Sequence, residues 1–296
     1  MSTSVVQEFK SIDAGLSMGT VTLRVVDIDR SLRFYRDVLG FSVIDRDGGT
    51  VQLGAGDRVL LELVETKSAM PRPRGTTGLY HVAILLPTRG DLGRILARIV
   101  EAGIPLGQSD HLVSEALYLS DPDGNGLELY RDRPRDQWKW RDGQVAMAVD
   151  PLDLRALLAD GRNGEWKGLP EGTVVGHVHL NVADLKTAEE FYHGVLGFDI
   201  VAKLPGALFV SAGGYHHHLG LNVWESRGGH VAPPSSVGLI QYTIELTSQA
   251  AVDSVLGRLK AAGVAVDEID GAVEFGDPFG NKVSLQSRVA YADATS

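Results

Sequence analysis

The sequence predicts an α+β fold of four βαβββ modules whose curved sheets form two incomplete barrel-like clefts. The first sign is internal repetition: Phe-Tyr-Arg-Asp-Val-Leu-Gly-Phe at 34–41 returns at 191–198 as Phe-Tyr-His-Gly-Val-Leu-Gly-Phe, and Asp-Pro-Asp-Gly-Asn at 121–125 returns at 277–281 as Asp-Pro-Phe-Gly-Asn. The second is that each half of the chain holds two strand-then-helix patterns. Because one module cannot bury both faces of its sheet, we expect the modules to pack in pairs that each enclose a cleft.

Each module opens with a strand in which every second residue is apolar, and a helix and shorter strands follow. The opening strands are predicted at 20–26, 80–86, 177–183 and 241–247, and the helices at 31–39, 91–102, 187–196 and 249–262. A glycine follows each helix, where a left-handed residue is favourable: Gly40, Gly103, Gly197 and Gly263. The N-terminal pair of modules is predicted at 17–132, a connector at 133–172 and the C-terminal pair at 173–288.

Composition and charge narrow the classes of partner and location. The net charge is -10 and no basic run offsets it, which argues against nucleic acid and anionic membranes as partners. The chain has no cysteine, so disulfides and thiolate metal ligands are excluded. Residues 1–15 lack the pattern of a signal peptide, and no stretch of about eighteen apolar residues suggests a membrane span. We therefore expect a cytoplasmic protein.

Three of the nine histidines stand in a row within the segment Tyr215–Asn222. Apolar residues alternate after them, so we expect a strand. Adjacent imidazoles are costly to bury without partners for their ring nitrogens, which favours a functional site over a surface cluster or a His-rich tract. On a strand, His216 and His218 would share the face of Asn222, and His217 would lie on the opposite face.

Alternation directs one residue in the first strand of each module toward the cleft: Thr20, His81, His177 and Gln241. The corresponding residues of the last strands are, in module order, Glu62, Glu128, Asn222 and Ser284. The middle modules thus offer two imidazoles and one carboxylate, from His81, His177 and Glu128. This set, with coordination positions left open, suits non-haem iron(II) and its oxygen chemistry. A lone strand histidine is as often a satisfied core residue, but three matching positions favour a metal site.

Ligand counting constrains how the modules pair. If module one paired with two and module three with four, His177 would lie in a different cleft from His81 and Glu128. A triad requires modules two and three to share a cleft within one chain, or module two of one chain to meet module three of another. The connector of about 40 residues can span either arrangement.

The βαβββ modules, the Phe-Tyr helices and the Asp-Pro-Asp-Gly-Asn turns resemble the vicinal oxygen chelate superfamily, which has the glyoxalase/bleomycin resistance/dioxygenase fold. This resemblance covers nearly the whole chain. Within the superfamily, three segments resemble extradiol ring-cleaving dioxygenases, namely the bacterial two-domain catechol 2,3-dioxygenases. These segments are Gly176-His177-Val178, the run around His216 and His217, and Tyr118 to Pro122 with Glu128. The usual extradiol order takes the second histidine and the glutamate from module four, whereas here they lie in module two.

The resemblance implies an enzyme that inserts O₂ into a catechol at a non-haem Fe(II) held by His81, Glu128 and His177. It implies catalytic roles for an acid–base histidine, its neighbour, an active-site tyrosine and a loop histidine: His217, His216, Tyr118 and His111. Substrate contacts are expected from His218, Phe209 and Trp224, with Tyr215 and Leu221 as further candidate walls. Manganese in place of iron, the substituent on the catechol, the choice of acid–base histidine and homo-oligomer formation are left open.

Two rival functions share this fold. A glyoxalase-type isomerase or lyase needs a further carboxylate, and the neutral Asn222 is expected at that place. A non-catalytic protein that sequesters a small molecule needs no metal ligands, so His81, Glu128 and His177 count against it.

Overall fold

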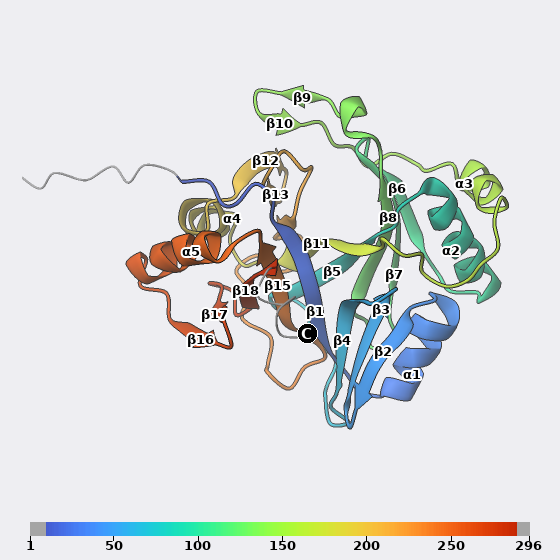
Figure 1. Cartoon of the computed structure of the whole chain (residues 1–296), viewed down its shortest axis with the longest axis horizontal. Coiled ribbons are helices and arrows are strands. Elements are labelled where there is room, and N and C mark those ends of the chain that lie inside the picture. The colour runs from blue at the N-terminus through green and yellow to red at the C-terminus, as the bar shows by residue number, and fades with distance from the viewer. Residues whose placement is uncertain (1–9, 289–296) are drawn as a thin grey trace, which may run out of the picture.

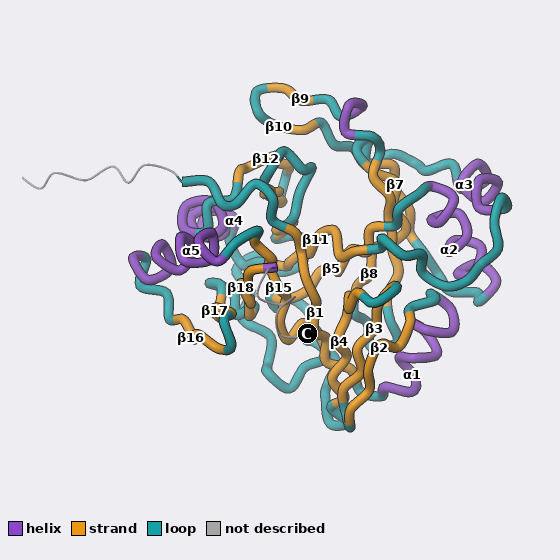
Figure 2. The backbone as a smooth tube through the Cα atoms, in the orientation of Figure 1, coloured by secondary structure: helices purple, strands orange, loops and turns teal. Residues whose placement is uncertain are grey.

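The computed structural model describes residues 10–288, which form two eight-stranded mixed sheets with the helices on their outer faces (Figures 1 and 2). Residues 1–9, part of the segment without a signal-peptide pattern, lie outside the described residues. No helix within 10–288 is long and apolar enough to cross a membrane.

All four predicted modules are present, in the expected β-α-β-β-β order. Module one comprises β1 (Ser17–Val25), α1 (Ile28–Leu32) with a π-helical extension (Arg33–Val38), β2 (Ser42–Asp47), β3 (Thr50–Ala55) and β4 (Arg58–Glu65). Module two comprises β5 (Gly78–Leu85), α2 (Arg89–Glu101), β6 (Gly107–Asp110), β7 (Ser114–Ser120) and β8 (Gly126–Asp132).

The second half of the chain repeats this plan after a connector. Module three comprises β11 (Val174–Asn181), α4 (Leu185–Glu189) with a π-helical extension (Glu190–Val195), β12 (Asp199–Leu204), β13 (Ala207–Ser211) and β14 (Leu219–Asn222). Module four comprises β15 (Gly238–Leu246), α5 (Gln249–Ala261), β16 (Val266–Ile269), β17 (Ala272–Gly276) and β18 (Lys282–Ser287). The connector holds a short 3-10 helix (Arg135–Gln137), the hairpin β9 (Trp140–Arg141) and β10 (Gln144–Val145), and α3 (Leu154–Gly161).

The sheets join modules from opposite halves of the chain. In one sheet β5 pairs antiparallel with β11, so modules two and three share a sheet within one chain. In the other, β1 pairs antiparallel with β15, which joins modules one and four. We call these the inner and the outer sheet, after their places in the chain. Of the two arrangements that ligand counting left open, the pairing within one chain is therefore the one observed.

The repeated motifs connect one sheet to the other. The hydroxyl of Tyr35 donates to Asp121 Oδ2 at 3.1 Å, and the hydroxyl of Tyr192 donates to Asp277 Oδ2 at 2.7 Å. Both tyrosines are fully buried, so each hydroxyl needs such a partner. The Phe-Tyr and Asp-Pro motifs thus recur together because each pair links the helix of one module to a turn of the next.

The predicted strand over the three histidines is wrong. Strand β14 begins only at Leu219, and the histidines lie in the loop between β13 and β14. Gly213 and Gly214 adopt φ values of 60° and 66°, and this left-handed pair turns the chain back after β13. The directions of the three histidine side chains are therefore set by a turn, and the alternation of a strand does not apply to them.

Candidate metal centre and its cavity

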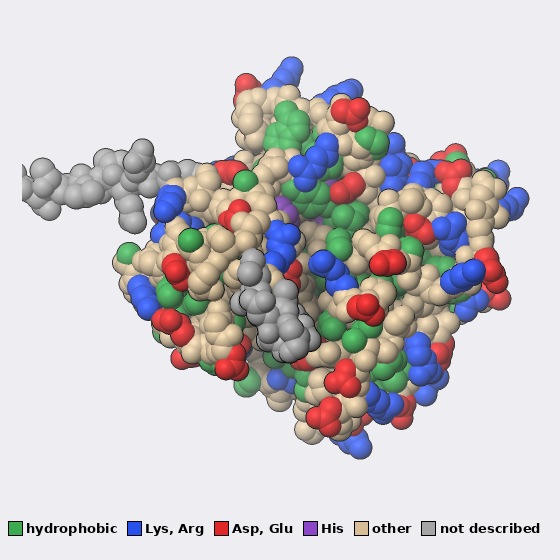
Figure 3. All heavy atoms as spheres, in the orientation of Figure 1, with side chains coloured by type: hydrophobic (Ala, Val, Ile, Leu, Met, Phe, Trp, Pro, Cys, Tyr) green, Lys and Arg blue, Asp and Glu red, His purple; other side chains and the backbone are tan. Residues whose placement is uncertain are grey.

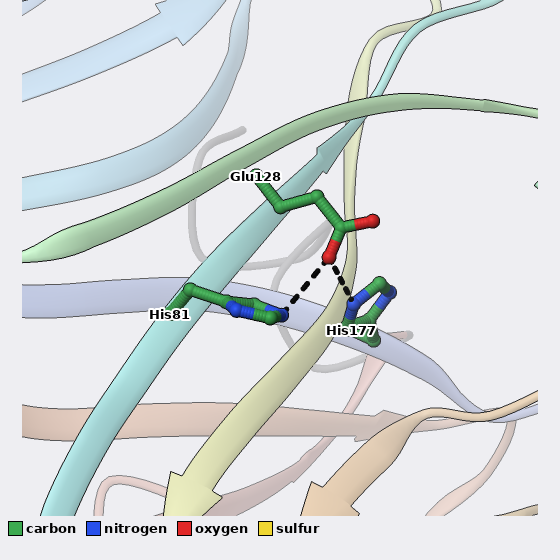
Figure 4. Close-up of side chains that lie close together, drawn as sticks. All are labelled: His81, Glu128 and His177. Atoms are coloured by element: carbon green, nitrogen blue, oxygen red, sulfur yellow. Dashed lines mark hydrogen bonds and ion pairs between the residues drawn. The ribbon is translucent and has the colours of Figure 1, made fainter. Parts of the chain in front are cut away.

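Three strands of the inner sheet bring the expected ligands to one point (Figure 4). His81 lies on β5, Glu128 on β8 and His177 on β11. Glu128 Oε2 lies 2.9 Å from His81 Nε2 and 3.1 Å from His177 Nε2. Within residues 10–288 this is the one group of histidine and acidic side chains close enough to hold a metal ion, with ligand atoms within 4.8 Å of one another.

The chemical state of these side chains fits a divalent ion. Burial lowers the pKa of His177 to about 4, so its imidazole is neutral at physiological pH. Burial alone would raise the pKa of Glu128, but the hydrogen bond with His177 and the close contact with His81 hold it well below its usual range. His81 Nε2 is buried without a hydrogen-bond partner. A divalent metal binds neutral imidazoles and ionised carboxylates, and His177 and Glu128 are in these forms.

Module three supplies no carboxylate at the position that matches Glu128. Strand β14 pairs with β11 in the register in which β8 pairs with β5, and in this register Gly220 corresponds to Glu128. The alignment of Asn222 with this position is therefore wrong by two residues. A Cβ on Gly220 would lie 2.8–2.9 Å from ring atoms of His179, so that ring occupies the space of a fourth ligand side chain.

The triad lines a cavity of about 350 Å³. Five more of the residues expected at the site also line it: His111, Tyr118, Phe209, His217 and Trp224. The other expected residues are absent from its lining: His216, His218, Tyr215 and Leu221. In Figure 3, histidine side chains are visible at the bottom of a hollow, and acidic and basic side chains are interspersed over the surrounding face.

Tyr118 and His111 form a hydrogen-bonded pair in this cavity. His111 Nδ1 lies 2.6 Å from the carbonyl oxygen of Ala148, and because a carbonyl only accepts, Nδ1 carries the hydrogen. With the single ring hydrogen on Nδ1, His111 Nε2 accepts from the Tyr118 hydroxyl at 2.6 Å. Burial and the nearby Glu128 raise the pKa of Tyr118 well above its usual value. Tyr118 is therefore a protonated phenol at the wall of the cavity.

The three consecutive histidines have three different surroundings. The ring of His217 lies 4.0 Å from that of His177 and 5.1 Å from that of Phe209, measured between ring centroids. His216 is fully buried behind it, with its Nδ1 2.8 Å from His217 Nδ1. His218 is directed to the other side, where its Nδ1 lies 2.9 Å from Ser211 Oγ. His217 is thus the member of the row that reaches the cavity.

Comparison with known proteins gives the family. The sequence profile of the Glyoxalase/Bleomycin resistance protein/Dioxygenase superfamily matches residues 17–129 and 174–285. The chain belongs to this superfamily. It is 48% identical over 273 residues to the catechol-2,3-dioxygenase of Bacillus subtilis (strain 168), covering 90% of this chain and 96% of that protein. It is 35% identical over 135 residues to biphenyl-2,3-diol 1,2-dioxygenase 3 of Rhodococcus globerulus, covering 41% of this chain and 71% of that protein.

Solved structures confirm the superfamily fold. A putative dioxygenase from Bacillus subtilis superposes with a TM-score of 0.65 at 13% identity, covering 94% of this chain and 86% of that one. Glyoxalase I from Zea mays superposes with a TM-score of 0.60 at 18% identity, covering 95% of each chain. The superfamily resemblance expected from the sequence is confirmed.

Some lining residues of this superfamily member were not among the expected site residues. His179 is buried, lines the cavity, and its Nε2 has no hydrogen-bond partner among the described residues. Its place two residues after His177, on the same strand face, was the signal that could have identified it. Tyr80 and the connector segment 147–149 also line the cavity. The connector residues carry no periodic pattern that would have indicated this.

Proposed function

We propose that this chain is an extradiol catechol 2,3-dioxygenase that uses a non-haem Fe(II), with Mn(II) as the alternative ion. The convergence of two imidazoles and one carboxylate on one point of the cavity wall carries the proposal. The 48% identity to a catechol-2,3-dioxygenase over 90% of the chain supports it. When bound, the ion would lower the pKa of a catechol hydroxyl and bring the catechol and O₂ together.

The chain's own residues divide the remaining work. His81, Glu128 and His177 would hold the ion, and Gly220 has no side chain that could serve as a fourth protein ligand. His217 is the base that takes a proton from a catechol hydroxyl and later returns it as an acid. The Tyr118 oxygen, held by His111, accepts a hydrogen bond from the substrate.

The cavity favours catechols with an uncharged, apolar substituent. Its volume of about 350 Å³ falls within the roughly 300–1,000 Å³ typical of small-molecule sites. No lysine or arginine is among its described lining residues, so a carboxylate on the substrate would lose its hydration without gaining a cation. Apolar side chains line it at Met147, Val149, Leu204 and Trp224, and three of these are partly open to solvent: Val149, Leu204 and Trp224.

The two rivals are less well supported. The glyoxalase-type reaction needs a further carboxylate, and Gly220 has no side chain at the matching position. A sequestering protein would have no use for three polar side chains buried together, which are costly without a ligand. The cytoplasmic location stays a prediction.

The test is anaerobic purification followed by loading with Fe(II), Mn(II) or Zn(II), and addition of aerated catechol, 3-methylcatechol, 2,3-dihydroxybiphenyl and 3,4-dihydroxybenzoate. We expect a yellow ring-opened product with Fe(II) or Mn(II) and none with Zn(II). The uncharged substrates should have the lower KM. A protein that binds iron but opens none of the four rings would overturn the proposed function.

A further inference from the structure

We infer that Asp132 and His216 are positioning residues that fix His217 in the tautomer whose Nε2 lone pair faces the cavity. This inference rests on the proposed role of His217 as a base. Asp132 ends β8, four residues after Glu128, and was not among the residues expected at the site. It touches neither the cavity nor the triad, so it acts through His216.

The Asp132 carboxylate, which can only accept, fixes the direction of the hydrogen bonds from Asp132 through His216 to His217. His216 Nε2 lies 2.8 Å from Asp132 Oδ1, and because a carboxylate only accepts, His216 Nε2 carries the hydrogen. In the form of His216 that carries one ring hydrogen, Nδ1 is then an acceptor. His217 Nδ1, 2.8 Å away, must therefore be the donor. This leaves His217 Nε2 without a hydrogen, as a base requires.

The packing around His216 holds this order in place. The side chain of His216 is fully buried, and its ring lies 4.1 Å from the Tyr215 ring and 5.2 Å from the Trp138 ring between centroids. A flip of the His216 ring would break both of its hydrogen bonds, and the Tyr215 and Trp138 rings packed against it leave little room for such a flip. Asp132 and His217 occupy both ring nitrogens of His216, so these two contacts set its tautomer.

The direct test is the tautomer itself, read by long-range ¹⁵N–¹H NMR of histidine-labelled, diamagnetic Zn(II)-loaded protein. We expect the hydrogen of His217 on Nδ1 in the parent protein, and a mixture of tautomers in Asp132→Ala. A hydrogen on Nε2 in the parent, or an unchanged spectrum in Asp132→Ala, would overturn the inference. Because this readout does not use activity, its failure is distinct from failure of the dioxygenase proposal.

Steady-state kinetics of the Fe(II)-loaded protein give a second test. Asp132→Ala should lower kcat by about 10–100-fold, as for the loss of comparable outer partners, and leave KM nearly unchanged. Asp132→Asn keeps an oxygen that accepts from His216 Nε2, so it should restore most of the lost kcat. Equal losses in the two variants, or none in Asp132→Ala, would contradict tautomer control.

The matched control is Glu274→Ala. Glu274 lies on the outer sheet, is 24% exposed, and accepts a hydrogen bond from Gln241 Nε2 at 2.9 Å. It resembles Asp132 in charge and exposure but lies outside the site, so kcat should not change. If Asp132→Ala does not fold, Asp132→Asn and the parent spectrum still decide the inference.

Discussion

The inner and outer sheets are built from the same modules, yet their equivalent positions carry different chemistry. In the inner sheet these positions hold His81, Glu128, His177 and Gly220. In the outer sheet they hold Thr20, Glu62, Gln241 and Ser284. The same fold therefore presents a candidate metal site on one sheet and ordinary polar groups on the other, so the chemistry resides in the residues and not in the architecture.

Burial separates the two sheets as much as residue type does. The inner ligands are all buried, whereas on the outer sheet Ser284 is buried and Thr20, Glu62 and Gln241 are half-buried. Glu62 and Gln241 bind polar neighbours on the same sheet. Glu62, for example, accepts from Thr22 Oγ1 and Gln52 Nε2, both at 3.4 Å. The connector adds to the difference, because its residues 147–149 line the inner cavity. A carboxylate that already accepts hydrogen bonds from the protein and contacts solvent is stabilised less by binding a metal ion than a buried carboxylate is.

The largest expected effect comes from exchanging the matched carboxylates. Glu128→Gln keeps the shape of the side chain but removes the negative charge that binds a divalent cation beside the two imidazoles. We expect bound iron, measured by elemental analysis, and ring-opening activity to fall to the level of metal-free protein. Glu62→Gln, at the equivalent position of the outer sheet, should leave both unchanged. Equal losses in the two variants would show that the sheets do not differ as described.

A methyl group at Gly220 should have the next largest effect. The added Cβ would lie under 3 Å from the His179 ring, and overpacking of this kind costs about 1–3 kcal/mol of unfolding free energy. Urea denaturation of Gly220→Ala measures this loss, and displacement of His179 should also raise KM.

Gly257→Ala is the control for this change. A Cβ at Gly257, within α5, would meet nothing within 4 Å, so the variant should be more stable by about 0.5–1 kcal/mol. If Gly220→Ala were as stable as Gly257→Ala, the packing of His179 against Gly220 would be refuted.

Acid should destabilise the inner sheet through His218. Burial lowers the pKa of His218 from 6.5 to about 3, so between these values the unfolded chain binds a proton that the folded chain does not. Stability therefore falls as pH drops through this window, by up to about 1.4 kcal/mol per pH unit for one such group. His218→Asn should reduce the slope by about one proton, as measured by urea denaturation of metal-free protein at pH 7, 6 and 5. An unchanged slope would show that His218 is not buried in its neutral form.

The smallest expected effect comes from the tyrosines that link the sheets. Tyr35→Phe and Tyr192→Phe each remove a buried hydrogen bond to an aspartate, which contributes about 1 kcal/mol, and Tyr192→Phe also removes a 3.2 Å contact with the Tyr242 hydroxyl. Thermal denaturation should therefore show a loss of stability in both variants, and the larger loss in Tyr192→Phe. A loss in one variant alone would mean that the two halves are not joined to their neighbours in the same way.

The module plan and the ligand triad could be predicted because both depend on repetition. The strand period of two and the repeated motifs place His81 and His177 at the same position of different modules, and ligand counting then requires modules two and three to meet. Asn222 was misaligned because the position in the last strand was counted from the Asp-Pro turn in modules two and four, and module three has no such turn.

The details around His217 depend on features that periodicity does not carry. Two left-handed glycines, Gly213 and Gly214, direct the histidine row into a turn, and only the folded chain brings Asp132 next to His216. The cavity wall at 147–149 comes from irregular chain in the connector. Contacts between distant, non-repeating segments leave no pattern in the sequence.

The most direct test of the metal site is a crystal structure of Fe(II)-loaded protein with an anomalous difference map collected on either side of the iron absorption edge. The predicted result is one iron peak per chain on the inner sheet, within bonding distance of His81 Nε2, His177 Nε2 and the Glu128 carboxylate. An iron peak at another position, or a fully soaked crystal without a peak at this triad, would contradict the account.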